Sequence, residues 1–278
     1  MELFGSYSGT DFLFFFGCLL AAAALAGLWI PANLRPEGRK SPVTDAEEAA
    51  VLAGGVTRHA MAVSADLMAR EGLVSASKNK VRVNRTELES GSAGRSVLRK
   101  IGEFDMRELR LATKADGEAI ADGLERRGLL MDAGQKWRLR WLSISPYLAL
   151  IALGLYRFFA GEAEGEPTGR LMALLFVAGG LALWRFLAIN PRTRAGNEVL
   201  RDLEEETSRL RRAPVANEAG FAVALFGTAV LVGTPWEQVH AMRQAGSGGD
   251  GGGFGDSDSD GGGGDGGGCG GGCGGCGG

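Results

Sequence analysis

Histidine is scarce in this sequence, and the residue patterns that support catalysis are missing. Two histidines occur in 278 residues, and neither His59 nor His240 has a Ser, Cys or carboxylate partner at motif spacing. The sequence contains no P-loop, dinucleotide fingerprint, nucleophile elbow or zinc-protease motif. No residue can therefore be assigned a catalytic role, which favours a non-enzymatic protein.

Cysteine is also rare, and its placement excludes a disulfide-stabilised domain. Of the four cysteines, Cys18 lies within an apolar run and the other three crowd the C-terminus. Disulfide frameworks of small secreted domains need paired cysteines spread along the chain. An odd trio in a terminal segment does not form one.

Basic residues are absent from the N-terminal segment. Met1 to Asp11 contains Glu2 and Asp11 but no Lys or Arg, whereas a signal peptide begins with a basic region. This favours an uncleaved N-terminal helix. Ala24-Leu25-Ala26 resembles a cleavage site, so removal of the segment is the alternative.

Three long apolar runs are present, at Phe12–Ile30, Leu142–Ala160 and Leu171–Ile189. A helix needs about 20 apolar residues to cross a hydrocarbon core of ~30 Å, and each run has about that length. The short connection at residues 161–170 joins the last two runs as an antiparallel hairpin. The sequence therefore predicts three transmembrane helices.

The distribution of charge predicts their orientation. Residues 31–141 contain 20 Lys and Arg against 16 Asp and Glu, whereas residues 161–170 contain three Glu and one Arg. Because Lys and Arg concentrate on the cytoplasmic side, we expect residues 31–141 and the chain after residue 189 to be cytoplasmic. Arg157 and Arg185 fall near opposite ends of the hairpin, where they can anchor it at the interfaces; a transport path is the alternative.

An internal repeat lies in the predicted cytoplasmic block. Residues 65–74 (ADLMAREGLV) and 121–130 (ADGLERRGLL) match with Ala, Asp, Arg, Gly and Leu in register. Both read as a helix stopped by glycine in the C′ position, at Gly72 and Gly128. A turn and an apolar strand follow each copy, at Val81–Val83 and at Trp137–Leu139. Helix, turn, helix and hairpin in this order predict a tandem winged-helix-like domain.

Local signals place the helices of these two units. Thr44 and Glu47 form a capping-box pattern for a short helix that Gly54-Gly55 ends, and Thr57 caps the next helix. In the second unit, Val97, Leu98 and Ile101 supply a helix, Met106, Leu109 and Leu111 continue the core, and Ala115–Arg127 forms the last helix.

A winged helix suggests DNA binding, but the charges argue against it. The helix that would enter a groove, Arg58–Glu71, carries Arg58, His59 and Arg70 but also Asp66 and Glu71. Phosphate recognition relies on clustered Lys and Arg. The sequence therefore favours protein contact or structural packing for this block.

After the third run, Gly196–Arg212 reads as a polar helix with a narrow apolar stripe. The apolar segment Ala219–Gly233 follows it. About 15 residues with three internal glycines are short for a crossing, so we predict a buried or interfacial helix, with a fourth crossing as the alternative.

The last segment, residues 246–278, holds 21 Gly, five Asp and no Lys or Arg, and we predict that it is disordered. Its three cysteines, Cys269, Cys273 and Cys276, could bind zinc or copper(I), with His240 as a distant fourth ligand. Low-complexity sequence without a bound metal is the alternative.

The whole layout resembles an uncharacterised bacterial membrane-protein family. The features that carry the resemblance are Leu52-Ala53-Gly54-Gly55, the turns at Gly72-Leu73 and Gly128-Leu129, the stretch 191–196 (PRTRAG) and the Gly- and Cys-rich terminus. The family combines a membrane domain with such a C-terminal tail. The resemblance implies no reaction, cofactor or catalytic residue.

The predicted fold is a mainly α multi-pass protein of the bacterial inner membrane. The predicted order is an external N-terminus (1–11), a transmembrane helix (12–30), the cytoplasmic domain (31–141), two transmembrane helices (142–160, 171–189) flanking an external loop (161–170), a cytoplasmic helical segment (190–245) and the tail (246–278).

Three functions fit this layout. The first is a membrane-anchored interaction or scaffold protein that engages the bilayer and an unknown cytoplasmic protein. The second is a component of a peptide-maturation system in which the tail is a modified segment. The third is a membrane-tethered DNA-binding regulator.

Overall fold

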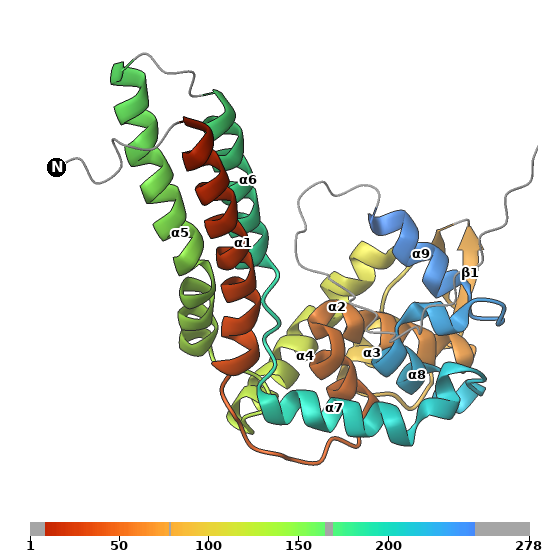
Figure 1. Ribbon diagram of the computed structural model, residues 1–278. Coiled ribbons are helices and arrows are strands. Elements are labelled where there is room, and N and C mark those ends of the chain that lie inside the picture. The colour runs from red at the N-terminus through yellow and green to blue at the C-terminus, as the bar shows by residue number, and fades with distance from the viewer. Residues whose placement is uncertain (1–8, 78, 165–168, 248–278) are drawn as a thin grey trace, which may run out of the picture.

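The computed structural model describes residues 9–77, 79–164 and 169–247, and within these ranges the chain is mainly helical. Three long helices form a bundle, and a globular body lies beside one end of it (Figure 1). From residue 248 onward the predicted tail, with Cys269, Cys273 and Cys276, lies outside the described residues.

The bundle consists of α1 (Gly9–Asn33), α5 (Ala133–Glu164) and α6 (Gly169–Leu187). In the described part of the chain, these three helices are long and apolar enough to cross a membrane. The prediction of three apolar helices of spanning length is confirmed. However, α5 begins nine residues before the predicted start at residue 142.

Large side chains fill the centre of the bundle, among them Phe16, Tyr147 and Leu175. The helices approach closely at Gly154, where a Cβ atom would lie 2.7 Å from Leu175 Cδ2 and 2.9 Å from Phe16 Cε2. The outer surface is apolar as well, since Phe14 is 78% and Phe176 is 74% exposed. Apolar side chains exposed on this scale suit contact with lipid rather than water.

The two arginines of the hairpin lie at different ends of the bundle. The guanidinium of Arg157 lies 5.8 Å from the centroid of the Phe12 ring, near the start of α1. Arg185 Nε donates a hydrogen bond of 2.7 Å to the carbonyl of Gly27, in the second half of α1. This is the arrangement that their sequence positions predict.

The body is built around α2 (Ala46–Ala69), which packs against α4 (Met106–Arg126) and α8 (Ala219–Phe226). A kink at Gly54 and Gly55 divides α2 into two segments, as the sequence predicts. Gly55 has a φ of 67°, which glycine adopts without strain. Asp45, rather than Thr44, caps the first segment, because its Oδ1 accepts a hydrogen bond from the Glu47 amide.

A small antiparallel sheet lies at one edge of the body in the order β1 (Leu73–Ser77), β2 (Lys80–Val83) and β3 (Glu103–Phe104). Val81 on β2 pairs with Phe104 on β3, and both side chains are buried in the core. The first predicted hairpin is therefore present. The helix α3 (Ser92–Leu98) precedes β3, and Ile101 lies after the end of α3 and is 99% exposed, so its predicted place in this helix is wrong. Leu111, predicted to continue the core, is 65% exposed, so this prediction is also wrong.

The second predicted hairpin is absent, because residues 133–164 form the single helix α5. The residues that read as a turn instead start this helix: Asp132 Oδ1 accepts from the Gln135 amide at 2.7 Å, and Gln135 Oε1 accepts from the Asp132 amide at 3.3 Å. These reciprocal hydrogen bonds make a capping box. Trp137–Leu139 is helical, so the structure does not show a tandem pair of winged-helix units.

Each of the two repeat copies ends a helix, but the residue with a positive φ at the helix end is a glycine in one copy and a glutamate in the other. Gly128 has a φ of 78° and stops α4, as predicted. After α2, the positive φ of 58° belongs to Glu71, so the assignment of Gly72 to this position is wrong. Gly72 is needed for packing instead, because a Cβ atom there would lie 2.4 Å from Leu88 Cδ1.

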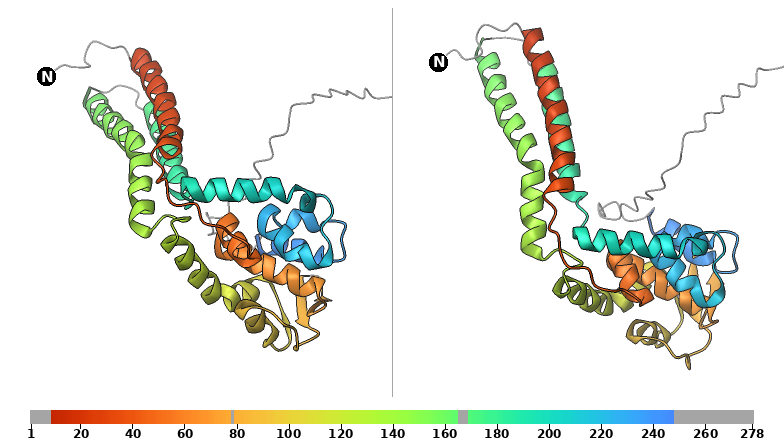
Figure 2. Two further views of the ribbon diagram at one scale, coloured as in Figure 1. Left: turned by 90° about the horizontal axis from the view of Figure 1, so that it is seen from below. Right: turned by 60° about the horizontal axis from the view of Figure 1, so that its bottom comes forward.

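The chain after the bundle completes the body. α7 (Arg194–Glu206) leaves the bundle crosswise and runs along the body (Figure 2). Its continuation, predicted as helix to residue 212, becomes the 3₁₀ helix η1 (Ser208–Arg211). After η2 (Ala216–Glu218), α8 is buried in the body core, which fits the predicted buried helix and not a fourth crossing. The helices η3 (Thr228–Leu231) and α9 (Gln238–Ser247) follow.

Three connectors join the bundle to the body, and they hydrogen-bond to one another. The segment after α1 contacts the segment after α4, since the Arg39 amide donates to the Gly128 carbonyl at 3.2 Å. The segment after α6 contacts both: the Thr193 amide donates to the Leu129 carbonyl at 3.0 Å, and the Arg194 amide donates to the Pro36 carbonyl at 2.9 Å. We call this network the junction.

Arg192 extends the junction into α2. Its Nε donates to the Leu52 carbonyl at 2.7 Å, and its Nη2 donates to the Ala53 carbonyl. These carbonyls end the first segment of α2, where the kink removes their helical partners. Burial lowers the pKa of Arg192 to about 10, with Glu204 opposing the shift.

Candidate functional site

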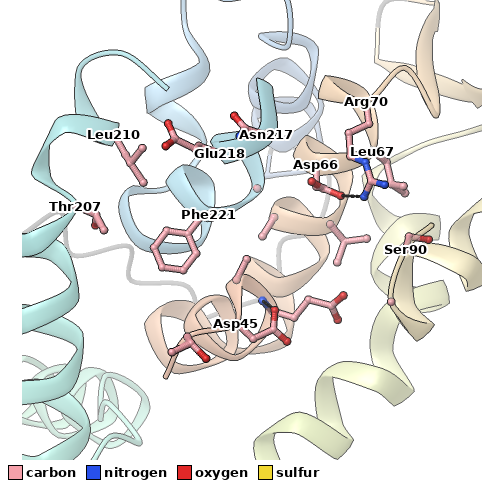
Figure 3. A pocket seen from close by; sticks show the side chains of 18 of the residues that line it. Asp45, Asp66, Leu67, Arg70, Ser90, Thr207, Leu210, Asn217, Glu218 and Phe221 are labelled. Carbon is pink, nitrogen blue, oxygen red and sulfur yellow. Dashed lines mark hydrogen bonds and ion pairs between the residues drawn. The ribbon is translucent and has the colours of Figure 1, made fainter. Parts of the chain in front are cut away.

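A cavity of about 560 Å³ opens between both ends of α2, residues 90–94 at the start of α3, the end of α7, η1 and α8. Apolar side chains form part of its lining: Ala62, Val63, Leu67, Leu210 and Phe221. Figure 3 shows the Phe221 ring projecting from α8 toward the space between α2 and the turn that carries Leu210. We call this cavity the groove. Its volume falls in the range of small-ligand and side-chain pockets.

Two glycines allow the walls of the groove to meet. A Cβ atom at Gly220 would lie 2.9 Å from Asp66 Cβ, so α8 approaches α2 closely at this point. A Cβ atom at Gly91 would lie 2.5 Å from Glu47 Oε1, so the start of α3 passes directly beside this carboxylate. Glycine at both positions brings segments distant in sequence into one lining.

Acidic side chains dominate the polar lining of the groove, which holds five carboxylates: Asp45, Glu47, Asp66, Glu206 and Glu218. The lining also holds two guanidiniums, and both are already paired. Arg70 Nη1 lies 3.2 Å from Asp66 Oδ2, and Arg209 Nη2 lies 2.6 Å from Glu218 Oε1. The lining therefore has an excess of three negative charges.

Two polar atoms in the lining have unused hydrogen-bonding capacity. Ser90 Oγ and the second carboxylate oxygen of Glu218, Oε2, are buried atoms without a hydrogen-bond partner among the described residues. Buried polar atoms in folded proteins are nearly always satisfied by protein or solvent. Both residues belong to the lining of the groove.

Behind the groove, His59 is fully buried and its Nε2 lies 2.9 Å from Glu47 Oε2. Its Nδ1 has no partner within the described ranges and faces α4, where a Cβ atom at Gly117 would lie 3.1 Å away. No hydrogen bond joins this ring to a Ser, Thr or Cys of the described chain. The contact with His59 therefore positions the Glu47 carboxylate. The two residues lack the nucleophile that a catalytic triad needs.

The residues proposed for DNA contact lie in the body core or the groove. Arg58 and His59 are buried, and Arg58 Nη1 donates to the Val223 carbonyl at 3.4 Å. Asp66 and Arg70 pair with each other in the acidic lining. This surface of α2 presents no cluster of cations of the kind that binds phosphate.

The metal site predicted at the tail is not described, but its fourth ligand is. His240 Nδ1 lies 3.0 Å from Thr228 Oγ1, and its Nε2 lies 2.9 Å from Gln244 Nε2. Burial and, next, Arg243 lower its pKa. Within residues 9–77, 79–164 and 169–247, no group of three or more His, Cys, Asp or Glu side chains is arranged to hold a metal ion.

Sequence reasoning missed the groove, although it named Glu47 and Asp66 for other reasons. Glu47 was expected to cap α2, and Asp66 was one residue of a repeat. The twelve-residue separation of Glu47 and His59 matches no known motif, so no local signal could have paired them. Comparison with family models, with curated proteins and with solved structures found no match to this chain.

Proposed function

We propose that this protein is a membrane-anchored, non-enzymatic binding protein whose groove receives a partner segment that carries a Lys or Arg side chain among apolar residues. The observation that supports this proposal is the groove itself. It combines an apolar wall, an excess of carboxylates and unsatisfied polar atoms in one cavity.

Charge and shape together favour this partner. A Lys or Arg side chain has an apolar stem and a cationic head. The stem would lie against Phe221 and Leu210, while the head would approach the carboxylates of Glu206 and Glu218. A desolvated charge in such a pocket contributes to affinity mainly through the matched carboxylate.

We further propose that α1, α5 and α6 cross the bacterial inner membrane, with the N-terminus outside and the body in the cytoplasm. The excess of Lys and Arg in residues 31–141 and the acidic connection at 161–170 support this orientation. The junction supports placing the N-terminus and the body on opposite sides, because all three connectors emerge at one end of the bundle.

Labelling of Cys269, Cys273 and Cys276 with an impermeant maleimide tests the orientation. We expect protection in intact cells and labelling after lysis. Labelling of these cysteines in intact cells would show that the tail, and with it the body, lies outside.

A peptide titration tests the groove. The full-length protein in lipid nanodiscs would be titrated with a fluorescein-labelled peptide of alternating Leu and Lys, and with the same peptide carrying Glu in place of Lys. We expect only the Lys peptide to bind, and its affinity to fall as salt is raised, because salt screens charge pairs near a surface.

Two variants and a matched control locate the binding. Phe221→Ala should weaken binding by about tenfold or more through the lost apolar contact. Glu206→Gln should weaken it by about two- to fivefold. Glu205→Gln is the control, since Glu205 lies next in the chain, is largely exposed and pairs with Arg201 outside the groove. Equal losses from the Glu205 and Glu206 variants, or equal binding of both peptides, would rule out the proposal.

A further inference from the structure

Three arginines converge where the bundle meets the junction. Arg185 Nε donates to the Gly27 carbonyl at 2.7 Å, and Arg194 Nη2 donates to the Asn33 carbonyl at 2.5 Å. Arg35 Nη1 donates to the Arg192 carbonyl at 2.9 Å. The three guanidiniums come from α6, α7 and the connector after α1, and all lie around the final turns of α1.

The positive charges of Arg185 and Arg194 act on Arg35. The pKa of Arg35 lies below its ordinary value because of burial and, next, because of the charges of Arg185 and Arg194. Within the described residues, none of the three forms an ion pair with an Asp or Glu side chain. Glu198, one turn after Arg194, pairs with Lys40 at 2.8 Å; this pairing and, as a smaller cause, the charge of Arg194 lower the pKa of Glu198.

Each guanidinium retains donors for a further ligand. A guanidinium has five N–H groups, and the hydrogen bonds described for Arg35, Arg185 and Arg194 use one N–H of each. Arginine forks match the oxygens of a phosphate group and bind them in pairs. A bound anion would also offset the positive charges of the three arginines, none of which is ion-paired with a carboxylate in the described residues.

The surroundings place this cluster at the depth of lipid head groups. Trp137, Trp141 and Phe186 pack edge-to-face at the same end of the bundle, with ring centroids 5.7 to 6.5 Å apart. Both tryptophans are about half exposed. Tryptophan collects at the boundary between hydrocarbon and head groups, so this end of the bundle fits such a boundary.

We infer that Arg35, Arg185 and Arg194 form a binding site for the phosphate of an anionic phospholipid. The inference rests on the part of the proposed function that places the three helices across a membrane, and it does not depend on the groove. A phospholipid head group and free inorganic phosphate both present a tetrahedral oxyanion to such a site. Experiment can separate these two sources of the ligand.

Native mass spectrometry of the detergent-solubilised full-length protein tests the site. We expect phosphatidylglycerol to be retained at least about fivefold more than phosphatidylcholine at equal concentration. Millimolar inorganic phosphate should not displace it, because the acyl chains add apolar contacts with the bundle. Equal retention of the two lipids would overturn the inference, and displacement by inorganic phosphate would assign the site to a soluble anion instead.

Variants assign the effect to the cluster. Arg35→Gln and Arg185→Gln should each lower phosphatidylglycerol retention by about threefold or more and leave phosphatidylcholine unchanged. Arg170→Gln, which removes an exposed arginine at the other end of α6, is the matched control. Arg185→Lys keeps the charge and guards against misfolding; it should retain more lipid than Arg185→Gln. An equal loss in the Arg170 variant would mean that nonspecific charge attraction explains the binding.

Discussion

Gly38 provides a sharp test of the junction. Its φ of 72° is strained for any residue with a Cβ atom, which costs about 1 kcal/mol. In addition, a Cβ atom would lie 2.2 Å from the Gly128 carbonyl oxygen and 2.4 Å from Thr193 Oγ1. The hydrogen bonds between the connectors hold the Gly128 carbonyl and Thr193 in place, so the backbone at residue 38 would have to move.

That movement would break two hydrogen bonds to the Gly128 carbonyl. The Arg39 amide donates to it at 3.2 Å, and Thr193 Oγ1 donates to it at 2.8 Å. Each contributes about 1 kcal/mol. We therefore expect Gly38→Ala to lower the free energy of unfolding by about 3 kcal/mol. For a body of this size, the loss corresponds to a melting temperature lower by about 6–12 °C.

Gly102→Ala is the matched control, because Gly102 has a similar φ of 88° but no atom within 4 Å of its Cβ position. Its cost should be the backbone strain alone, about 1 kcal/mol and about 2–4 °C. The measurement is thermal unfolding of the purified full-length protein in detergent, followed by scanning fluorimetry. Equal shifts for the two variants would show that the connectors are not tightly packed at Gly38.

Three further predictions concern other parts of the body. Arg192→Met leaves the Leu52 and Ala53 carbonyls without their hydrogen-bond donor, so it should lower the free energy of unfolding by about 2–4 kcal/mol in the thermal assay. Arg201→Met, at an exposed position of α7, is the control and should leave the free energy of unfolding almost unchanged. Asp132→Ala removes the cap of α5 and should lower the free energy of unfolding by about 1 kcal/mol in the same assay. Asp122→Ala, on the exposed face of α4, is the control, and an equal loss of stability in both variants would contradict the capping assignment. The folded-state pKa of His240 is lowered from 6.5, so the unfolded chain binds its proton more readily, and stability should fall as pH decreases through about 6.5. Urea midpoints at pH 7.5 and 5.5 should therefore differ more in the wild type than in His240→Gln.

Features that depend on composition along a short stretch were predictable. The three apolar helices follow from the length of the apolar runs, and the kink of α2 follows from Gly54-Gly55. The β1–β2 hairpin follows from the turn after Ser77 and the alternation at Val81–Val83. Each of these signals lies within the element that it specifies, so no distant residue can easily override it.

The errors arose where two local readings compete. Asp132-Ala133-Gly134-Gln135 suits a turn as well as a capping box, and the helix wins because the apolar run beyond it continues the same helical register. Glu71 adopts a conformation usually left to glycine because Arg85 pairs with its carboxylate at 2.8 Å and Asn84 Nδ2 donates to its carbonyl at 3.1 Å. Such compensation by later residues cannot be read from the helix end alone.

The three helices of spanning length, the separate polar block and the Gly-rich terminus can be read from the sequence, because composition and periodicity act locally. The groove, the junction and the arginine cluster depend instead on tertiary packing. Each of these joins side chains from segments far apart in the chain, such as Glu47 with Glu218 or Arg35 with Arg194. Within its own segment each residue looks like ordinary surface charge, and packing is what brings these charges together from distant segments.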